Sequence, residues 1–159
     1  MTYIRPDHFS DPKILVTTHS AVQNSSNTAQ VATTISGSVM EYTPSANATS
    51  VVYEISFYAF KSGIMDNSFM LQNYVSSSWS EINTRYLRNV GNSGSFSQHY
   101  RWLMRFQWVI PAWTGARSHR VAVASHSTNR NVQLHKLEDF DGATATDTFM
   151  PTHLIMYSI

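Results

Sequence analysis

Histidine is the residue type in this chain best suited to bind a metal ion or to move a proton near neutral pH. A metal site is normally signalled by ligands at a set local spacing, such as two histidines four residues apart on a helix. The seven histidines show no such spacing, and the chain has no cysteine. We therefore expect no metal, no cofactor and no disulfide. The histidines are His8, His19, His99, His119, His126, His135 and His153.

A short acidic segment resembles the start of a calcium-binding loop. It reads Asp139-Phe140-Asp141-Gly142, but the glutamate that would complete such a loop is missing downstream. An Asp-Gly turn is therefore the better interpretation.

Serine, histidine and aspartate are all present, so composition alone leaves room for a catalytic triad. The chain contains no Gly-x-Ser-x-Gly segment that would present a nucleophilic serine, and no pair of carboxylates stands out for glycoside hydrolysis. We expect no catalytic residue and no enzymatic activity.

Arginines interleaved with aromatic residues mark the middle of the chain. This pattern could indicate a face that binds single-stranded nucleic acid. A formal net charge of +1 argues against nucleic acid, however, and arginine is also the preferred cation at protein interfaces. We expect subunit contacts, with solvated faces as the alternative. The arginines are Arg85, Arg88, Arg101, Arg105, Arg117 and Arg120.

Residues 99–110, HYRWLMRFQWVI, give the strongest structural signal in the chain. Successive side chains leave opposite faces of a strand, and this run alternates strictly. One face carries Leu103, Arg105, Gln107 and Val109, and Pro111 ends the run. We predict the central strand of an antiparallel sheet. Its core face would hold Tyr100, Trp102, Met104, Phe106, Trp108 and Ile110.

The other segments predict an all-β protein, an antiparallel β-sandwich of the jelly-roll type with roughly eight strands. Turn-rich clusters separate short runs of apolar residues, and Gly37 marks a bulge or bend within one of them. Residues 81–88 are ambiguous between a short helix and a strand. The expected strands, besides 99–110, are 13–20, 31–42, 51–60, 69–78, 119–126, 132–137 and 149–159.

The length and composition indicate one domain. The chain has 159 residues, of which 42% are hydrophobic and 13% charged, about half the usual charged fraction. We assign residues 14–159 to a single β-sandwich domain and residues 1–13 to an extended arm, with a frayed terminus as the alternative. No signal peptide or membrane-spanning run is apparent, which predicts a protein made in a cytoplasm. The expected anchoring residues of the arm are Tyr3, Ile4, Arg5, Pro6 and Phe9.

The last strand, 149–159, is apolar on both faces. A sandwich strand with one solvated face should alternate apolar and polar residues, so a second apolar face predicts contact with another chain. We expect a homo-oligomer with this strand near its axis. The predicted interface residues are Leu154, Ile155, Met156, Tyr157, Ile159, Arg101 and Arg105.

Residues 37–57, GSVMEYTPSANATSVVYEISF, resemble small virion structural proteins of tailed phages, notably phages of cyanobacteria and marine bacteria. The aromatic strand 102–108, the segment 132–135, Asp141-Gly142 and the last strand fit the same resemblance, which covers residues 37–159. The resemblance implies a jelly-roll sandwich, often a trimer, on the particle surface. Its partners would be other virion proteins, such as major capsid or tail proteins.

Two roles follow from this resemblance. We favour a capsid decoration (cement) protein, because the chain has no coiled coil and no repeats that could form a fibre shaft. The alternative is a tail-fibre head that binds a host receptor, with a host-surface glycan as the partner. A carbohydrate-binding β-sandwich outside virions is the second alternative, and binding to a glycan array would favour either of these over cement.

Overall fold

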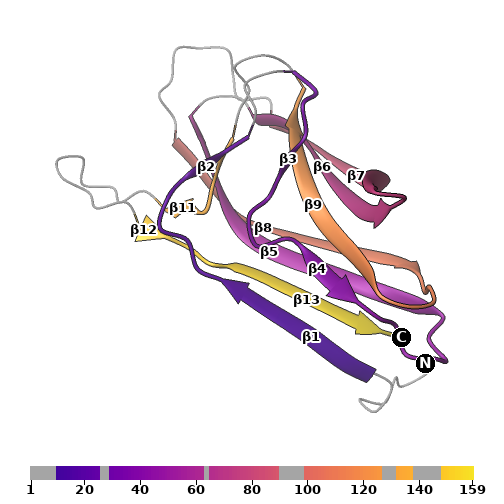
Figure 1. The fold of residues 1–159 in the computed structure, drawn as a ribbon. Helices are drawn as coiled ribbons and strands as arrows, with labels where there is room; N and C mark the ends of the chain where they lie inside the picture. The colour runs from indigo at the N-terminus through magenta and orange to yellow at the C-terminus, as the bar shows by residue number, and fades with distance from the viewer. Residues whose placement is uncertain (1–9, 26–28, 63–64, 90–98, 127–131, 138–147) are drawn as a thin grey trace, which may run out of the picture.

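A computed structural model describes residues 10–25, 29–62, 65–89, 99–126, 132–137 and 148–159. In these ranges every regular element is a β-strand, and the strands form two antiparallel sheets that pack face to face (Figure 1). The prediction of an all-β antiparallel sandwich is confirmed. The jelly-roll connectivity stays a prediction.

The first sheet is built around β5, a strand of 13 residues. On one side β5 pairs with β8, and on the other side it pairs with β13 and then, further along, with β10. Strand β1 lies outside β13, and β2 lies outside β10 (Figure 1). The bounds are β1 Ser10–Thr17, β2 Gln23–Asn24, β5 Ser50–Ser62, β8 His99–Pro111, β10 Gln133–Leu134 and β13 Thr152–Ser158.

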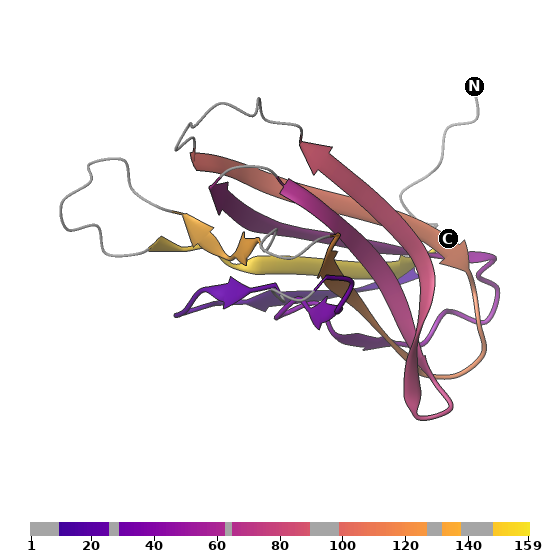
Figure 2. The ribbon, with the colours of Figure 1, turned by 90° about the horizontal axis from the view of Figure 1, so that it is seen from above.

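The second sheet is built around β9, which pairs with β6 on one side and with β3 and β4 on the other. Strand β7 lies outside β6, and Figure 2 shows these strands crossing the first sheet obliquely. The bounds are β3 Thr33–Thr34, β4 Met40–Tyr42, β6 Met65–Val75, β7 Ser78–Asn89 and β9 Arg117–Ser125. A separate pair is formed by β11 Lys136–Leu137 and β12 Thr148–Phe149.

The prediction that residues 99–110 form a central strand is wrong. Within the described residues β8 pairs only with β5, so it is an edge strand of the first sheet. Alternation reports which face of a strand is buried and contains no information on how many neighbours the strand has. Where side chains are described, the predicted faces are confirmed, since Met104, Phe106, Trp108 and Ile110 are buried, while Leu103 and Val109 are each 60% exposed. The side chain of Tyr100 lies outside the described residues. Trp102 is only partly buried.

The ambiguous segment 81–88 is strand, because it lies within β7. The chain enters β7 through a tight turn at Ser76 and Ser77, whose φ angles are 51° and 63°. Two consecutive residues with positive φ are typical of a hairpin turn that matches the twist of its strands. The predicted strand 69–78 therefore ends earlier than expected, at Val75.

The bend predicted at Gly37 is confirmed. Residues 31–42 divide into β3 and β4, and Gly37, with a φ of 78°, lies between them. A similar break divides residues 132–137 into β10 and β11 at His135, whose φ is 68°. Both breaks bring the main chain against β13 or β5, where the candidate site is built.

Aromatic rings fill the core between the sheets. Phe106 of β8 contacts Phe69 of β6 at a centroid distance of 4.8 Å and Trp108 at 5.5 Å. Tyr53 of β5 meets Trp108 edge to face at 6.0 Å. Such pairs add to the free energy gained by burying their apolar surface.

Two residues predicted at an oligomer interface lie in this core instead. Leu154 and Met156 of β13 have no exposed surface within the protomer. Their face of β13 is covered by the second sheet of the same chain, so only the opposite face of this strand can meet another subunit. The two-sided apolar pattern did not indicate which face the protomer itself would bury.

The boundary of the predicted arm falls inside a strand. Residues 10–13 belong to β1, whose neighbour is β13. Lys13 donates a hydrogen bond from Nζ to the carbonyl of Glu41, 2.8 Å away, and so links β1 to the second sheet. Tyr3, Ile4, Arg5, Pro6 and Phe9 lie outside the described residues, and their anchoring role stays a prediction.

Candidate functional site

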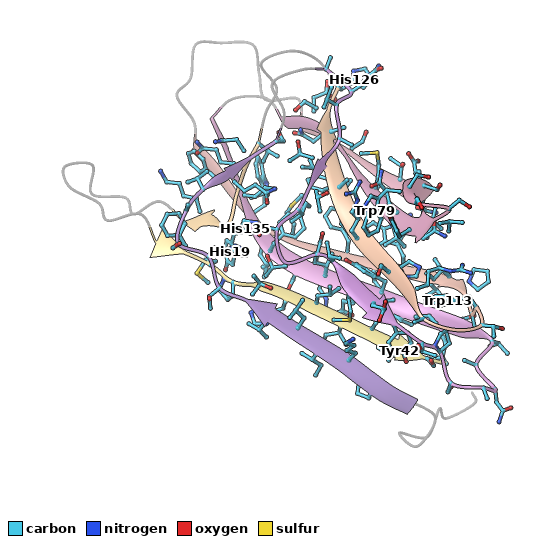
Figure 3. All side chains as sticks on the ribbon, viewed as in Figure 1. His19, Tyr42, Trp79, Trp113, His126 and His135 are labelled. Carbon is cyan, nitrogen blue, oxygen red and sulfur yellow. The ribbon has the colours of Figure 1, made fainter. Side chains whose placement is uncertain are left out.

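Two histidines stack on each other at one end of the sandwich. The rings of His19 and His135 are 3.7 Å apart between centroids and nearly parallel, at 11° (Figure 3). His135 has no exposed surface. Its main chain is fixed on both sides, because its N–H donates to the carbonyl of Tyr58 and its carbonyl accepts from the N–H of Met150.

The side chain of Gln23 determines which nitrogen of His135 carries the proton. Its Oε1 accepts from the N–H of Ser36 at 2.7 Å, and its Nε2 donates to the carbonyl of Thr34, so the orientation of the amide is fixed. His135 Nε2, 3.1 Å from Gln23 Oε1, must therefore donate. A neutral His135 then has an unprotonated Nδ1.

The hydroxyl of Thr152 completes this network. It lies 3.2 Å from His135 Nδ1 and from the carbonyl of Ser36, which are alternative acceptors of its one proton. Because that proton goes to one of these, the hydroxyl accepts from His19 Nε2 at 2.9 Å. If His135 gains a proton on Nδ1, the Thr152 hydroxyl can turn to Ser36, and every polar group keeps a partner.

The surroundings favour a neutral His135. Burial, and after it the proximity of His19, lower its pKa from 6.5 to about 4. Burial also lowers the pKa of His19. Thr152 is fully buried, and no described carboxylate joins the cluster. The hydrogen bonds of the cluster therefore suit a structural role, in which they hold β13, β2 and the β10–β11 break together.

A cavity of about 450 Å³ lies between the sheets, beside the turn from β8 to β9. Figure 3 shows Trp113 and Tyr42 near the opposite end of the sandwich from the stacked histidines. The cavity has an apolar wall, contributed mainly by the end of β8, and a few polar groups. Its lining consists of Asn73, Ile82, Ile110, Pro111, Ala112, Trp113, Thr114, Arg117 and His119.

His119 forms the buried side of this cavity, and neither of its ring nitrogens has a hydrogen-bond partner of ordinary geometry. The ring of Trp113 covers it at a centroid distance of 4.5 Å, and Trp113 Nε1 is also buried without a partner. The pKa of His119 is lowered from 6.5 to about 4, chiefly by burial. A weak interaction with the main chain of Arg117 opposes this shift, and the charge of Arg117 adds to it.

The outer face of the first sheet collects several of the predicted interface residues. Tyr157 and Ile155 are half-buried there, and the register aligns Ile155 with Ile14 on β1 and with Glu54 on β5. Arg105 lies on the same face and pairs with Glu54, with Nη2 and Oε1 2.6 Å apart. Ile159, 44% exposed, follows β13. The side chain of Arg101 lies outside the described residues.

The arginines of the middle of the chain do not share one surface. Arg105 is on the outer face of the first sheet, and Arg117 lines the cavity. Arg120 lies on the outer face of the second sheet, where its guanidinium is 4.2 Å from the centre of the Trp79 ring. Arg120 also donates to Gln72 and Thr34. Sequence adjacency grouped residues that the two sheets separate.

Neither the stacked histidines nor the cavity was predicted from the sequence. A signal for the cavity was available, because His119 shares the face of β9 that carries Val121 and Val123, both fully buried. A histidine in a row of buried valines predicts an inward-facing ring. No such signal existed for His19 and His135, which meet through loops far apart in the chain.

The described residues contain no group of three or more metal-ligating side chains and no helix long and apolar enough to cross a membrane. The absence of a metal and of a membrane partner therefore stays a prediction.

No known family model matches the chain, and no curated protein sequence matches it. Solved structures are similar in fold only. One is of infectious bursal disease virus, Gt strain, with 13% identity, a TM-score of 0.43, and coverage of 99% of this chain and 42% of that one. Another is the VP2 subviral particle of the same virus, with 13% identity, a TM-score of 0.40, and coverage of 99% and 41%. The chain thus spans less than half of these proteins, and the similarity is too distant to assign a function.

Proposed function

We propose that this chain is a non-enzymatic structural protein of a tailed-phage virion, and that it decorates the capsid surface as a cement protein. It is made in the host cytoplasm and resides in the virion. The observation that supports this most is the apolar outer face of the first sheet. The resemblance of residues 37–159 to small phage virion proteins gives the proposal its class.

This face differs from an ordinary solvated sheet surface. Ile14 and Val16 on β1 are 62% and 51% exposed, and Leu103 and Val109 on β8 are each 60% exposed. These aliphatic side chains stand on the two flanking strands, with Ile155 and Tyr157 between them. Exposed apolar patches on a sheet mark sites of protein contact.

A second copy of the chain is the partner that we propose for this face. Ile155, Tyr157, Ile159 and Arg105 would contribute, whereas the buried Leu154 and Met156 would not. The Arg105–Glu54 pair places a charge-assisted contact within an apolar surface, a composition typical of interfaces. The resemblance implies a trimer. Strand β13 would lie near its axis.

The arm would join the oligomer to a major capsid or tail protein. Because β1 begins at Ser10, the segment free for this role is shorter than residues 1–13. Deleting residues 1–9 should therefore keep the sandwich folded and reduce incorporation into particles. Unchanged incorporation would remove the arm from the proposal.

A receptor-binding role, as a tail-fibre head or a carbohydrate-binding module, is the second candidate. It is favoured by one observation on the second sheet, where Tyr74, 47% exposed, lies 5.2 Å from Trp79 between ring centroids. Aromatic faces beside polar side chains can stack on sugars. A glycan-array signal that is lost in Tyr74→Ala would favour this role over cement.

Mass spectrometry of purified particles of the encoding phage tests the main proposal directly. Hundreds of copies per particle indicate a capsid role, a few copies indicate a tail role, and absence from the particle contradicts both.

Sedimentation tests the interface, because the double variant Ile155→Asp and Tyr157→Asp should give monomers or aggregates. Val39→Asp, at an exposed valine beside β4, is the matched control and should leave the oligomer intact. A wild type that sediments as a monomer at micromolar concentration would exclude the interface, and a dimer would exclude only the trimer.

A further inference from the structure

The cavity beside the β8–β9 turn has the size and lining of a ligand site. Its volume of about 450 Å³ lies within the usual range for small-molecule sites. Ile82, Ile110 and Pro111 give it an apolar wall, and Asn73 and Thr114 add polar groups near Trp113. This composition suits a compact organic molecule with an apolar or ring-shaped body.

Arg117 gives the cavity a positive charge that no described acid neutralises. The described ion pairs join Arg105 to Glu54 and His126 to Asp66, and no acidic side chain lines the cavity. The guanidinium instead lies 5.4 Å from the centre of the Trp113 ring. A guanidinium presents parallel N–H groups that match the two oxygens of a carboxylate.

A second, independent observation comes from the buried side of the cavity. His119 has no exposed surface, and its two nitrogens, like Trp113 Nε1, lack hydrogen-bond partners of ordinary geometry. Buried polar groups are almost always satisfied, so three such atoms in two adjacent, tilted rings need an explanation. They offer two N–H donors and one acceptor, since a neutral imidazole has one of each.

The His119 ring lies against the ring of Trp113, so a ligand would reach its nitrogens when the Trp113 ring shifts. Trp113 sits on the turn that contains Gly115, and a Cβ added to Gly115 would meet nothing within 4 Å. The turn therefore has free space beside Gly115. A shift of Trp113 would change its fluorescence, which makes the residue a reporter of its own site.

We propose that this cavity binds a small organic carboxylate, with Arg117 pairing to the carboxylate and His119 and Trp113 hydrogen-bonding to other polar groups of the ligand. Two sources share this chemistry, an acidic sugar of a glycan and a free carboxylic acid. The inference does not depend on the virion proposal.

Titration of the full-length protein with defined probes tests the site, with Trp fluorescence and calorimetry as readouts. The acidic sugar probes are N-acetylneuraminate and glucuronate, the free acid is benzoate, and glucose and benzamide are uncharged controls. We expect saturable binding of at least one acid, and at least tenfold weaker binding of its uncharged counterpart. Saturation by the sugars alone identifies the glycan source, and saturation by benzoate alone identifies the free acid. No saturation by any acid up to about 10 mM, or equal binding of the uncharged probes, overturns the proposal.

Variants assign the binding to the cavity. Arg117→Gln should weaken binding of the acid at least tenfold, whereas Arg85→Gln, at an exposed arginine of β7 that does not line the cavity, should leave it unchanged. Equal binding by wild type and Arg117→Gln overturns the proposal. If Arg117→Gln fails to fold, the imidazole resonances of His119 in the wild-type protein decide. They should shift on addition of the acid while those of His135 stay fixed, and a spectrum in which His119 does not move overturns the proposal.

Discussion

The sandwich holds two fully buried histidines, one near each end, and they differ in one respect. Burial lowers the pKa of His119 and of His135 alike, to about 4. His135 has partners for both ring nitrogens, in Gln23 and Thr152, whereas His119 has none of ordinary geometry. Burial thus sets the protonation state, while the partners decide whether a buried histidine stabilises the fold or leaves polar atoms available to a ligand.

Two glycines repeat this contrast. Gly37 and Gly115 both have a φ of 78°, a conformation that other residues adopt with strain. A Cβ on Gly37 would lie 2.8 Å from Thr17 Cβ and 3.0 Å from Thr152 Cβ, next to the stacked histidines. A Cβ on Gly115, in the turn beside the cavity, would meet nothing. The region around His135 is closely packed, and the region around His119 is open on one side.

Acidification should have the largest effect on stability. An unfolded chain binds a proton on each histidine near pH 6.5, but the folded chain binds these two protons only near pH 4. The free energy of unfolding should therefore have its full value above pH 6.5. It should fall as the pH drops toward 4, by up to about 1.4 kcal/mol per pH unit for each histidine. Urea unfolding between pH 4 and 8 measures this slope. A flat profile would contradict the neutral state of both rings.

Alanine at the two glycines should separate the two regions. Gly37→Ala combines a strained φ with backbone-close contacts to Thr17 and Thr152, and we expect a loss of about 4 kcal/mol. Gly115→Ala carries only the cost of the conformation, about 1 kcal/mol. Thermal unfolding of both variants makes the comparison, and equal losses would show that the packing around Gly37 is looser than the contacts indicate.

Leucine at the two histidines should have effects of different size. His135→Leu removes two hydrogen bonds of about 1 kcal/mol each and places a leucine at a φ of 68°, for a total loss of about 3 kcal/mol. His119→Leu removes buried groups that have no partner, so the free energy of unfolding should stay within about 1 kcal/mol of the wild type or rise. In each variant, the free energy of unfolding should also depend less on pH, because one buried histidine is gone. Denaturant titrations at pH 5 and pH 8 would reveal this.

The sequence predicted the fold class and the faces of its strands. The alternation in residues 99–110 identified Met104, Phe106, Trp108 and Ile110 as core residues, because a strand buries every second side chain. The same pattern could not show that β8 is an edge strand, since pairing partners depend on the whole topology. It also could not show which apolar face of β13 is covered by the protomer.

The sites were predictable only in part. The contacts around His135 join Gln23, Ser36 and Thr152, which approach one another only after the strands have paired. The cavity depends on the position of the β8–β9 turn relative to β7, which no local pattern fixes. The predicted trimer, the arm contacts and the role of Arg101 stay predictions.

The pairing order of the first sheet has a consequence for synthesis on the ribosome. Strand β5 can pair with β8 when the middle of the chain has emerged, but its other edge waits for β13 along Val51–Ser56. Among the described residues, β1 in turn has only β13 as its neighbour. Until β13 leaves the exit tunnel, β1 has no place in the sheet and this edge of β5 keeps unpaired main-chain groups. We therefore expect nascent chains that stop before residue 152 to be sensitive to protease and bound by chaperones, with protection gained in one late step.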